Sequence, residues 1–496
     1  MNEHETLAAV DLGSNSFRLQ VGRVVGSQIY ELDSLKETVR LASGLDSKKN
    51  LSETCQANAL ATLKRFGERL RGFSPEAVRA VGTNTLRVAK NATTFLNKAE
   101  AALGFPIEII AGREEARLIY IGVAHGMPLS KEQRLVVDIG GGSTECIIGE
   151  GLNPIKTESL YMGCVTYTAR FFPDGRIDDD RLRQAEFAAR AEVETISASF
   201  GETGWHTAVA SSGTARTIAE MLRANGWAES GITRSGLKKL RAALIKAGEV
   251  KRLNIDGLTA DRAPIIVGGF AIMTGIFNEL DIPEMVLSDY ALRHGVLYDL
   301  LGRAQHQDMR ETTVNAFTRR YQVDRAQAAR VEAIALDLYE QIAQNIPDAQ
   351  RDHERQLLTW AARLHEVGIS IAYSSYHKHS AYILQNADMP GFSRMDQGRL
   401  ALIVQPHRGS LAKAQVALTQ LTDIPLTLAL RIAVLLSRGR GGTELPAIRL
   451  TQREHGFELA IEKAWLKDHP LTETALDEET RQWQSVDVHL RLKRLG

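Results

Sequence analysis

The sequence has few cysteines, no excess charge of either sign and no long uninterrupted hydrophobic run. Its 496 residues include three cysteines, Cys55, Cys146 and Cys164, which are too few and too scattered for a disulfide framework or a zinc site. Lys plus Arg and Asp plus Glu each number 60, so the formal net charge is zero. Since general nucleic-acid or membrane-surface binders usually carry a basic excess, any affinity for a polyanion must come from local charge placement.

The sequence also lacks the segments that direct a protein to a membrane or across one. Its first residues show no basic stretch followed by an apolar run, which predicts that there is no signal peptide. The apolar stretch Ile424–Leu436 contains Pro425 and Arg431 and is too short to span a bilayer. Hydrophobic residues at 44% and charged residues at 24% exclude a fibrous or wholly disordered chain, so we expect a cytoplasmic globular protein.

A chain of this length predicts three or four domains. Strand-like and helix-like segments alternate over the first 300 residues, which is typical of α/β architecture. Amphipathic helices then follow one another from Gln305 to Arg440, and short strand patterns return in the last 55 residues. We therefore expect two α/β lobes over residues 1–124 and 125–302, an all-α domain over 303–440 and a small β-containing domain over 441–496.

An internal repeat supports the division into two lobes. Residues Asp11–Gly22 align with Asp138–Gly149 at a constant offset of 127, with Asp, Gly, Ser and Gly matching at fixed positions. Each copy predicts a strand that ends in an aspartate, a tight turn and a second strand.

The two turns have the composition of phosphate-binding loops. Their glycines permit close approach of backbone N–H groups to phosphate oxygens, and their hydroxyl and amide side chains add donors. The candidate phosphate-binding residues are Gly13, Ser14, Asn15 and Ser16 in the first turn and Gly140, Gly141, Gly142, Ser143 and Thr144 in the second. Asp11 and Asp138 are hard oxygen ligands suited to Mg²⁺ on the same phosphates. The alternative is a pair of ordinary hairpins whose aspartates cap neighbouring backbone.

Five motifs in order resemble the exopolyphosphatase/guanosine pentaphosphate phosphohydrolase (Ppx/GppA) family. They read DLGSNSFRL, GTNTLRVAKN, AGREEARLIYIGV, VVDIGGGSTE and ASSGT, and LHEVG and HSAYILQN extend the resemblance into the helical part. The family belongs to the actin, sugar kinase and Hsp70 superfamily. The resemblance therefore implies two actin-like (ribonuclease H-like) lobes, followed by a helical HD-like domain.

The resemblance also implies roles for single residues. Glu115 corresponds to the catalytic base and Arg87 to the arginine that grips the phosphate under attack. Ser212, Gly213 and Thr214 fall where the superfamily places a further loop that faces the ligand, and Glu145 is a third candidate ligand of Mg²⁺. Read from the residues alone, Glu115 could simply favour a helix N-terminus. Likewise, Arg87 could be a surface arginine and Glu145 a solvent-facing strand residue.

Motif identity favours a phosphohydrolase over a kinase, since the sequence shows no distinct adenosine or acceptor pocket. We expect an exopolyphosphatase that uses Mg²⁺ to release orthophosphate from inorganic polyphosphate. A monovalent cation is a second candidate cofactor. The alternatives are hydrolysis of guanosine pentaphosphate (pppGpp) to guanosine tetraphosphate (ppGpp), which would place the protein in the stringent response, and a sensor without turnover. The family resemblance further implies a homodimer.

The helical region has a local basic excess. Residues 351–440 contain 11 Lys plus Arg against 6 Asp plus Glu, together with five of the 13 histidines. Such a region could hold a long polyanion, or its charges could be an ordinary solvated surface. His365-Glu366 resembles the HD signature with Glu in place of the metal-binding Asp, which predicts a degenerate HD-like domain used for binding. His353, His377 and His379 do not complete a metal set in the sequence, and contact of His407 and Arg408 with substrate is a further expectation.

Overall fold

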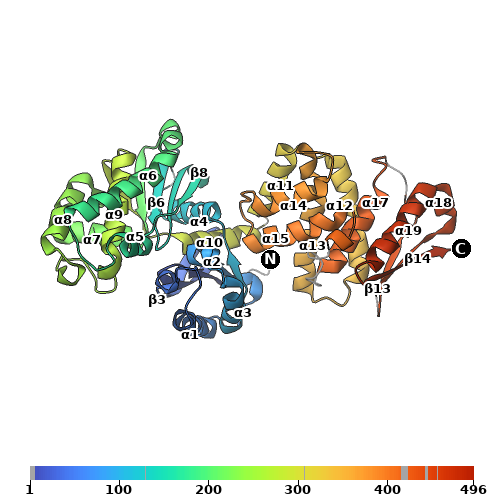
Figure 1. The fold of residues 1–496 in the computed structure, drawn as a ribbon, viewed down its shortest axis with the longest axis horizontal. Helices are drawn as coiled ribbons and strands as arrows, with labels where there is room; N and C mark the ends of the chain where they lie inside the picture. The colour runs from blue at the N-terminus through green and yellow to red at the C-terminus, as the bar shows by residue number, and fades with distance from the viewer. Residues whose placement is uncertain (1–5, 129, 306–307, 415–422, 442–444, 455) are drawn as a thin grey trace. The chain divides into compact units, whose positions relative to one another are not determined.

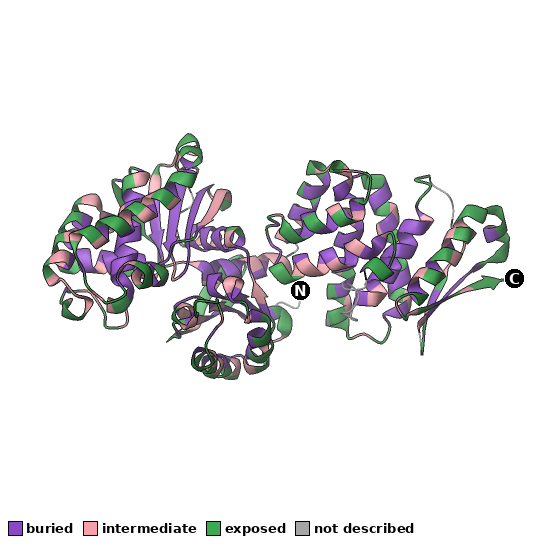
Figure 2. Cartoon of the chain, viewed as in Figure 1, coloured by how far each residue is buried: buried purple, intermediate pink, exposed green. Residues whose placement is uncertain are grey.

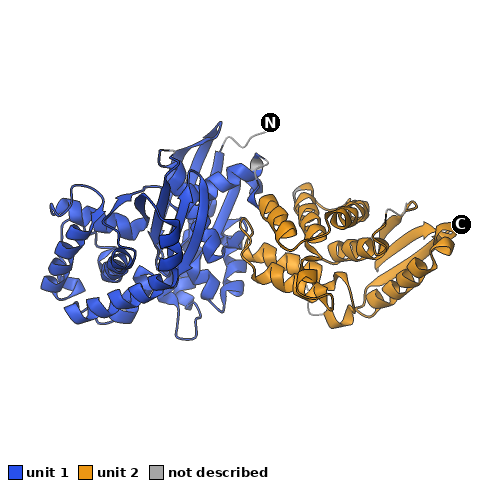
Figure 3. Ribbon diagram, turned by 90° about the horizontal axis from the view of Figure 1, so that it is seen from above, with its two compact units in different colours: residues 1–309 blue, residues 310–496 orange. Residues whose placement is uncertain are grey.

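The structure is a computed structural model that describes residues 6–128, 130–305, 308–414, 423–441, 445–454 and 456–496. The chain forms two compact units, residues 1–309 and residues 310–496 (Figure 3). The domain boundaries expected at residues 124, 302 and 440 divide the chain more finely than these two units, and they stay predictions.

The first lobe of unit 1 is built on a five-stranded sheet in the order β3-β2-β1-β4-β5. Its strands are β1 (Thr6–Leu12), β2 (Ser16–Val25), β3 (Gln28–Thr38), β4 (Val78–Gly82) and β5 (Ile107–Ile109). Its helices are α1 (Glu53–Arg69), α2 (Asn84–Val88), α3 (Ala92–Leu103) and α4 (Gly112–His125). β1 pairs antiparallel with β2 and parallel with β4, so the first turn opens at the carboxyl end of a central strand.

The second lobe repeats this plan, as the internal repeat predicted. Its sheet has the order β8-β7-β6-β9-β11-β10, in which the hairpin β6–β7 takes the place of β1–β2. The strands are β6 (Gln133–Ile139), β7 (Thr144–Glu150), β8 (Asn153–Leu160), β9 (Thr207–Ser211), β10 (Ile232–Thr233) and β11 (Glu284–Leu287). The helices are α5 (Cys164–Phe171), α6 (Asp179–Thr203), α7 (Ser212–Ala224), α8 (Arg234–Ala247), α9 (Ile266–Glu279) and α10 (Leu292–Ala304).

Helices α4 and α10 fill the space between the two sheets (Figures 1 and 2). Alternate residues of the first strand of each sheet point to opposite faces. Ala8 and Val10 therefore pack in the outer core of the first lobe, while Leu7 and Ala9 face α4 and α10. Val136 of β6 faces the same two helices from the second lobe. Burial on both faces explains why these strands read as continuous apolar runs.

Unit 2 consists of helices followed by a three-stranded sheet, and one apolar core runs through both. Its helices are α11 (Met309–Arg320, which begins at the unit boundary), α12 (Arg325–Ile342), α13 (Asp348–Leu364), α14 (Tyr376–Asn386), α15 (Arg394–Val404), α17 (Ile424–Leu436), α18 (Lys463–Asp468) and α19 (Pro470–Gln484). Its strands are β12 (Arg449–Arg453), β13 (Gly456–Glu462) and β14 (His489–Leu495). The apolar stretch Ile424–Leu436 is a core helix of this unit, and within the described part of the chain no helix could cross a membrane.

Candidate active site

The same strand alternation that builds the cores positions the two repeat aspartates. Asp11 lies on the face of β1 that carries Leu7 and Ala9, and Asp138 shares a face of β6 with Val136. Both faces look toward α4 and α10. The two carboxyl groups therefore approach the central helices from opposite lobes, each near the carboxyl end of its strand.

The two glycine-containing turns lie against each other at the base of the cleft. A methyl group on Gly141 would be 2.9 Å from Ser14 Cβ, and one on Gly142 would be 2.5 Å from Asn84 Oδ1. Thr85 donates a hydrogen bond of 2.8 Å to Ser14 Oγ, which fixes the first turn from α2. Glycine is thus required at these positions because the loops of the two lobes meet there without room for a side chain.

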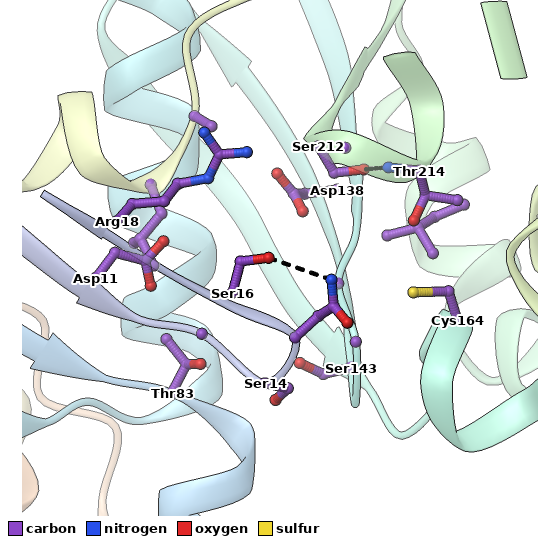
Figure 4. A pocket seen from close by; sticks show the side chains of 18 of the residues that line it. Asp11, Ser14, Ser16, Arg18, Thr83, Asp138, Ser143, Cys164, Ser212 and Thr214 are labelled. Atoms are coloured by element: carbon purple, nitrogen blue, oxygen red, sulfur yellow. Dashed lines mark hydrogen bonds between the residues drawn. The ribbon is translucent and has the colours of Figure 1, made fainter. Parts of the chain in front are cut away.

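A third segment approaches the same space from the end of β9. Ser212 begins α7 with φ of +90°, a conformation that non-glycine residues rarely adopt. Its Oγ accepts hydrogen bonds from the backbone N–H groups of Thr214 and Ala215. In Figure 4, Ser212 and Thr214 lie on the same side of the cavity as Asp138, opposite Asp11 and Arg18. Strain of this kind persists where the surroundings hold the backbone, often at functional sites.

Glu115 lies in the first turn of α4, as expected from the strand-to-helix pattern. Its side chain is buried and lines the cavity. Arg87, from α2, donates a hydrogen bond of 2.6 Å from Nη1 to Glu115 Oε2 and a second one to the carbonyl of Ile110. Arg87 therefore contacts the predicted base and is absent from the residues that line the cavity. Its role as the group that grips the phosphate stays a prediction.

Most of the predicted site residues line one cavity of about 120 Å³, room for several water-sized groups. Those that line it are Asp11, Gly13, Ser14, Asn15, Ser16, Glu115, Asp138, Gly140, Gly141, Ser143, Ser212, Gly213 and Thr214. Gly142, Thr144 and Glu145 lie behind this surface. Thr144 donates to the carbonyl of Met162, and Glu145 accepts a hydrogen bond of 2.8 Å from Ser159.

The cavity also contains residues that the sequence did not single out. Four of them are arginines: Arg18 from β2, Arg216 from α7, Arg293 from α10, and Arg262 from the segment before α9. Arg18 stands directly opposite Asp11 across the β1–β2 ladder, a pairing that follows from the hairpin register. The others are far apart in the sequence and meet only in the folded lobe. Cys164 is a further lining residue, at the start of α5, and burial raises the pKa of its thiol.

The carboxyl groups of the cavity repel one another. Burial, helped by the charges of Glu115 and Asp138 and opposed by Arg18 and Arg293, raises the pKa of Asp11 to about 7. Burial likewise raises the pKa of Asp138 to about 6, and it raises the pKa of Glu145 well above its usual range. The pKa values of Asp11 and Asp138 stay raised although Arg18 and Arg293 oppose the shift, so a bound cation would stabilise the charged carboxylates.

The arginines of the cavity also repel one another, because their positive charges lie close together. Burial and the neighbouring Arg18 together lower the pKa of Arg293 to about 10. Burial also lowers the pKa of Arg18. Guanidinium groups that repel one another around a cavity form a site for an anion of several charges, because planar N–H donors match phosphate oxygens.

The residues present fit a divalent cation bound together with phosphate. Asp11 Oδ1 is buried and has no hydrogen-bond partner among the described residues. No group of three or more His, Cys, Asp or Glu residues within the described ranges could hold a metal ion by itself. Mg²⁺ is commonly bound by one or two carboxylates, water and substrate phosphates, and Asp11 with Asp138 matches that pattern.

The sequence matches the Ppx/GppA phosphatase family over residues 20–304 and domain III of Ppx/GppA phosphatases over residues 309–480. An exopolyphosphatase from Cytophaga hutchinsonii has 25% identity to this chain and a TM-score of 0.55, over 60% of this chain and 98% of that one. A Ppx/GppA enzyme from Aquifex aeolicus has 26% identity and a TM-score of 0.50, over 59% of this chain and 98% of that one. The chain thus belongs to the Ppx/GppA phosphatase family, with its actin-like fold, and is a phosphoanhydride hydrolase.

Proposed function

We propose that this protein is an Mg²⁺-dependent exopolyphosphatase, which removes the terminal phosphate of inorganic polyphosphate as orthophosphate. The observation that carries the proposal is the composition of one cavity. It combines a carboxylate suited to act on water, two carboxylates suited to a divalent cation, two turns of backbone N–H groups and four arginines. Hydrolysis of a phosphoanhydride needs positioning and charge neutralisation more than covalent chemistry.

In the proposed reaction, Glu115 accepts a proton from a water molecule whose oxygen attacks the terminal phosphorus. The bond between that phosphorus and the bridging oxygen breaks, and the shortened chain leaves with the bridging oxygen. The turns at residues 13–16 and 140–143 donate hydrogen bonds to the phosphate oxygens. Asp11 and Asp138 would hold Mg²⁺, which when bound neutralises charge on the transferred group.

The arginines support a substrate with several successive phosphates. Arg18 lies on β2 of the first lobe, and Arg293 lies on α10, which fills the space between the two sheets. Arg216 and Arg262 belong to the second lobe. A chain of phosphates that enters between the lobes would meet guanidinium groups on both sides. The triphosphate group of pppGpp shares this chemistry, so it is included in the test below.

Unit 2 offers fewer free cations than its sequence suggested. Six of the eleven Lys and Arg residues in 351–440 form ion pairs with acidic residues of the same unit, namely Arg351, Arg355, Arg363, Arg399, Arg431 and Arg440. The other five, Lys378, Arg394, Arg408, Lys413 and Arg438, remain as candidates for contact with a long polyanion. We propose a degenerate HD-like binding role for this region and retain the homodimer and the cytoplasmic location as predictions.

Orthophosphate release in the presence of Mg²⁺ tests the proposal with three substrates: long-chain polyphosphate, pppGpp and ATP. We expect fastest release from polyphosphate, loss of activity with a chelator and a rate about 10²–10⁴-fold lower in Glu115→Gln, the usual scale for a general base. Glu150→Gln, at the exposed end of β7, is the matched control and should keep full activity.

Each departure from this result has a definite meaning. Preference for pppGpp would keep the site and change the substrate. Undiminished release in Glu115→Gln would remove Glu115 from the mechanism. Absence of release from all three substrates would reject the proposal in favour of a binding protein that closes on its ligand without turnover.

A further inference from the structure

A buried network of six charges connects the helix that carries Glu115 to helix α10. Its cations are Arg79, Arg117 and Arg303, and its anions are Glu108, Glu114 and Asp299. The six residues come from β4, β5, α4 and α10. Two of the contacts, Glu114–Arg117 and Asp299–Arg303, lie within one helix turn, and the others join segments that are far apart in the sequence. Three positive and three negative charges make the network neutral, which is the condition under which buried charges are tolerated.

Asp299 is the centre of the network because it contacts all three arginines. Its Oδ2 lies 2.7 Å from Arg79 Nη1 and 3.3 Å from Arg303 Nε, and its Oδ1 accepts a hydrogen bond from Arg117 Nη2. The side chain is 6% exposed. Although burial acts to raise its pKa, the surrounding arginines hold that pKa well below the usual range.

Arg117 carries the connection to the active site. It donates to both oxygens of Glu114, at 2.7 and 2.8 Å, one turn earlier on α4. Glu114 is the neighbour of Glu115 in the chain, so this bidentate pair fixes the helical turn from which the base projects. Through Arg117, the first turn of α4 is therefore held by a carboxylate of α10.

The two helices also cross in backbone contact. A methyl group on Gly122 would lie 2.4 Å from the carbonyl oxygen of Ala291, and one on Gly295 would lie 1.7 Å from that of Leu118. The glycines set the distance between the helices, and the charge network on one side of the crossing sets their rotation and register. Arg293, near the start of α10, lines the cavity that Glu115 also lines.

We infer that Asp299 is a positioning residue for catalysis: it acts through Arg117 and Glu114 to hold Glu115 at the distance from the substrate that proton transfer requires. The inference rests on the proposed role of Glu115 as base. Asp299 is absent from the cavity lining and reaches no substrate. Misplacement of a reacting group by about 1 Å costs about 100-fold in rate, so a remote residue of this kind has a measurable effect.

The test compares the full-length protein with Asp299→Asn in the polyphosphate assay. We expect kcat to fall by about 10- to 100-fold while KM changes less than about twofold, because the phosphate-binding turns are untouched. Glu186→Gln is the matched control. Glu186 pairs with Arg241 at 3.0 Å and accepts a hydrogen bond from Asn278, in a part of the second lobe away from α4 and α10. This control should lower the melting temperature without changing kcat.

A second variant separates positioning from simple loss of charge balance. Asp299→Asn combined with Arg303→Gln makes the network neutral again, so we expect the melting temperature to recover while kcat stays low. Recovery of both would overturn the inference, as would an unchanged kcat in Asp299→Asn. If Asp299→Asn does not fold, Asp299→Glu keeps the charge and moves it by one methylene group, and an unchanged kcat in that variant would also overturn the inference.

Failure of the proposed function would look different. Wild-type protein that releases no orthophosphate from polyphosphate or pppGpp contradicts the proposed activity, whatever Asp299 does. The connection itself can then be measured by hydrogen exchange. Asp299→Asn should lose protection at the amides of residues 115–118 relative to Glu186→Gln, and equal protection in the two variants would overturn the inference.

Discussion

At the scale of single residues, Glu115 is surrounded by charges of both signs. The negative charge of Glu115 contributes to the raised pKa values of Asp11, Asp138 and Glu145. Arg87 forms an ion pair with Glu115 at 2.6 Å. The arginine thus compensates the carboxylate that serves as base in the proposed reaction. Holding Glu115 is therefore an alternative to the predicted contact of Arg87 with phosphate.

Arg87→Ala should lower kcat at pH 7 by about 10²-fold or more, the scale of a lost general base. Without the guanidinium, Glu115 loses the ion pair that orients its carboxylate. We therefore expect kcat to fall while KM changes little. The measurement is kcat and KM for Arg87→Ala and Arg87→Lys, of which the lysine variant should be less affected.

A different outcome would return Arg87 to the phosphate. If KM rises together with the loss of rate in Arg87→Ala, then the guanidinium contacts substrate. Binding of long chains that weakens without any change in kcat would make Arg87 a tether.

Asp11→Asn should raise the melting temperature of the Mg²⁺-free protein at pH 8 and abolish activity. The pKa of Asp11 is raised to about 7 in the folded state, above its ordinary value of 3.8. Between those values the folded state binds more protons than the unfolded state, so this group makes the protein less stable as pH rises through the window. Thermal unfolding should therefore show a larger gain at pH 8 than at pH 5, and equal gains would contradict the assignment.

At the scale of elements, the crossing of α4 and α10 depends on two glycines. Gly295→Ala places a methyl group where the carbonyl of Leu118 lies, so the helices must separate. We expect destabilisation by about 1–3 kcal/mol or more, the range for overpacked cores, together with a loss of kcat. Chemical denaturation and the orthophosphate assay measure the two effects.

Gly201→Ala is the matched control for that substitution. Gly201 is also in a helix, α6, and a methyl group there would meet nothing within 4 Å. This variant should be more stable by about 1 kcal/mol, since alanine is the better helix former, with unchanged activity. Similar stability of the two variants would mean that the helix crossing tolerates a side chain.

The sequence predicted the elements with the strongest patterns and missed those with polar ones. The sequence pattern predicts a strand over Thr6–Leu12, which is the range of β1, and helices over Leu51–Arg71 and Asp178–Ser199, which correspond to α1 and α6 with shifted ends. β3 carries no such pattern because it is an edge strand whose side chains are largely exposed. The β-rich stretch Val486–Leu492 predicts the last strand, but β14 begins at His489, since Val486 and Val488 pack on the core outside any strand.

At the scale of the whole molecule, unit 2 contains two buried histidines that take no part in the proposed reaction. His365 and His407 of unit 2 are almost completely buried, and each Nδ1 forms a hydrogen bond with a backbone carbonyl of its own segment. In neither ring does Nε2 have a hydrogen-bond partner among the described residues, and Nε2 of His365 lies 4.0 Å from Glu366 Oε1. The two rings lie 5.1 Å apart at right angles.

Unit 2 should lose stability as pH falls from 7 to 5. Burial lowers the pKa values of His365 and His407 below their ordinary value of 6.5. Below that pH the unfolded chain binds protons that the folded state does not, so unfolding becomes more favourable. Hydrogen exchange in α13 and α15 should report this loss. His407→Asn keeps a donor for the carbonyl of Val404 and should flatten the pH dependence, and an unchanged slope would contradict the assignment.

The sequence by itself determined the duplicated α/β plan, the two aspartate-ended hairpins, the family and the position of Glu115 at a helix start. These features depend on local patterns: alternation, glycine-containing turns and a repeat at a constant offset of 127. Thirteen predicted site residues meet in one cavity because the repeat fixes which strand ends lie beside the central helices.

Only the tertiary structure decided which charges meet. The pairing of Arg87 with Glu115, the arrival of Arg216, Arg262 and Arg293 at the cavity and the contacts of Asp299 join segments that are far apart in the chain. A single charged residue carries no periodic pattern in a sequence, since its energy depends on burial and on partners that long-range packing supplies. The fold and the loops could therefore be predicted from local sequence, whereas the electrostatics of the site could not.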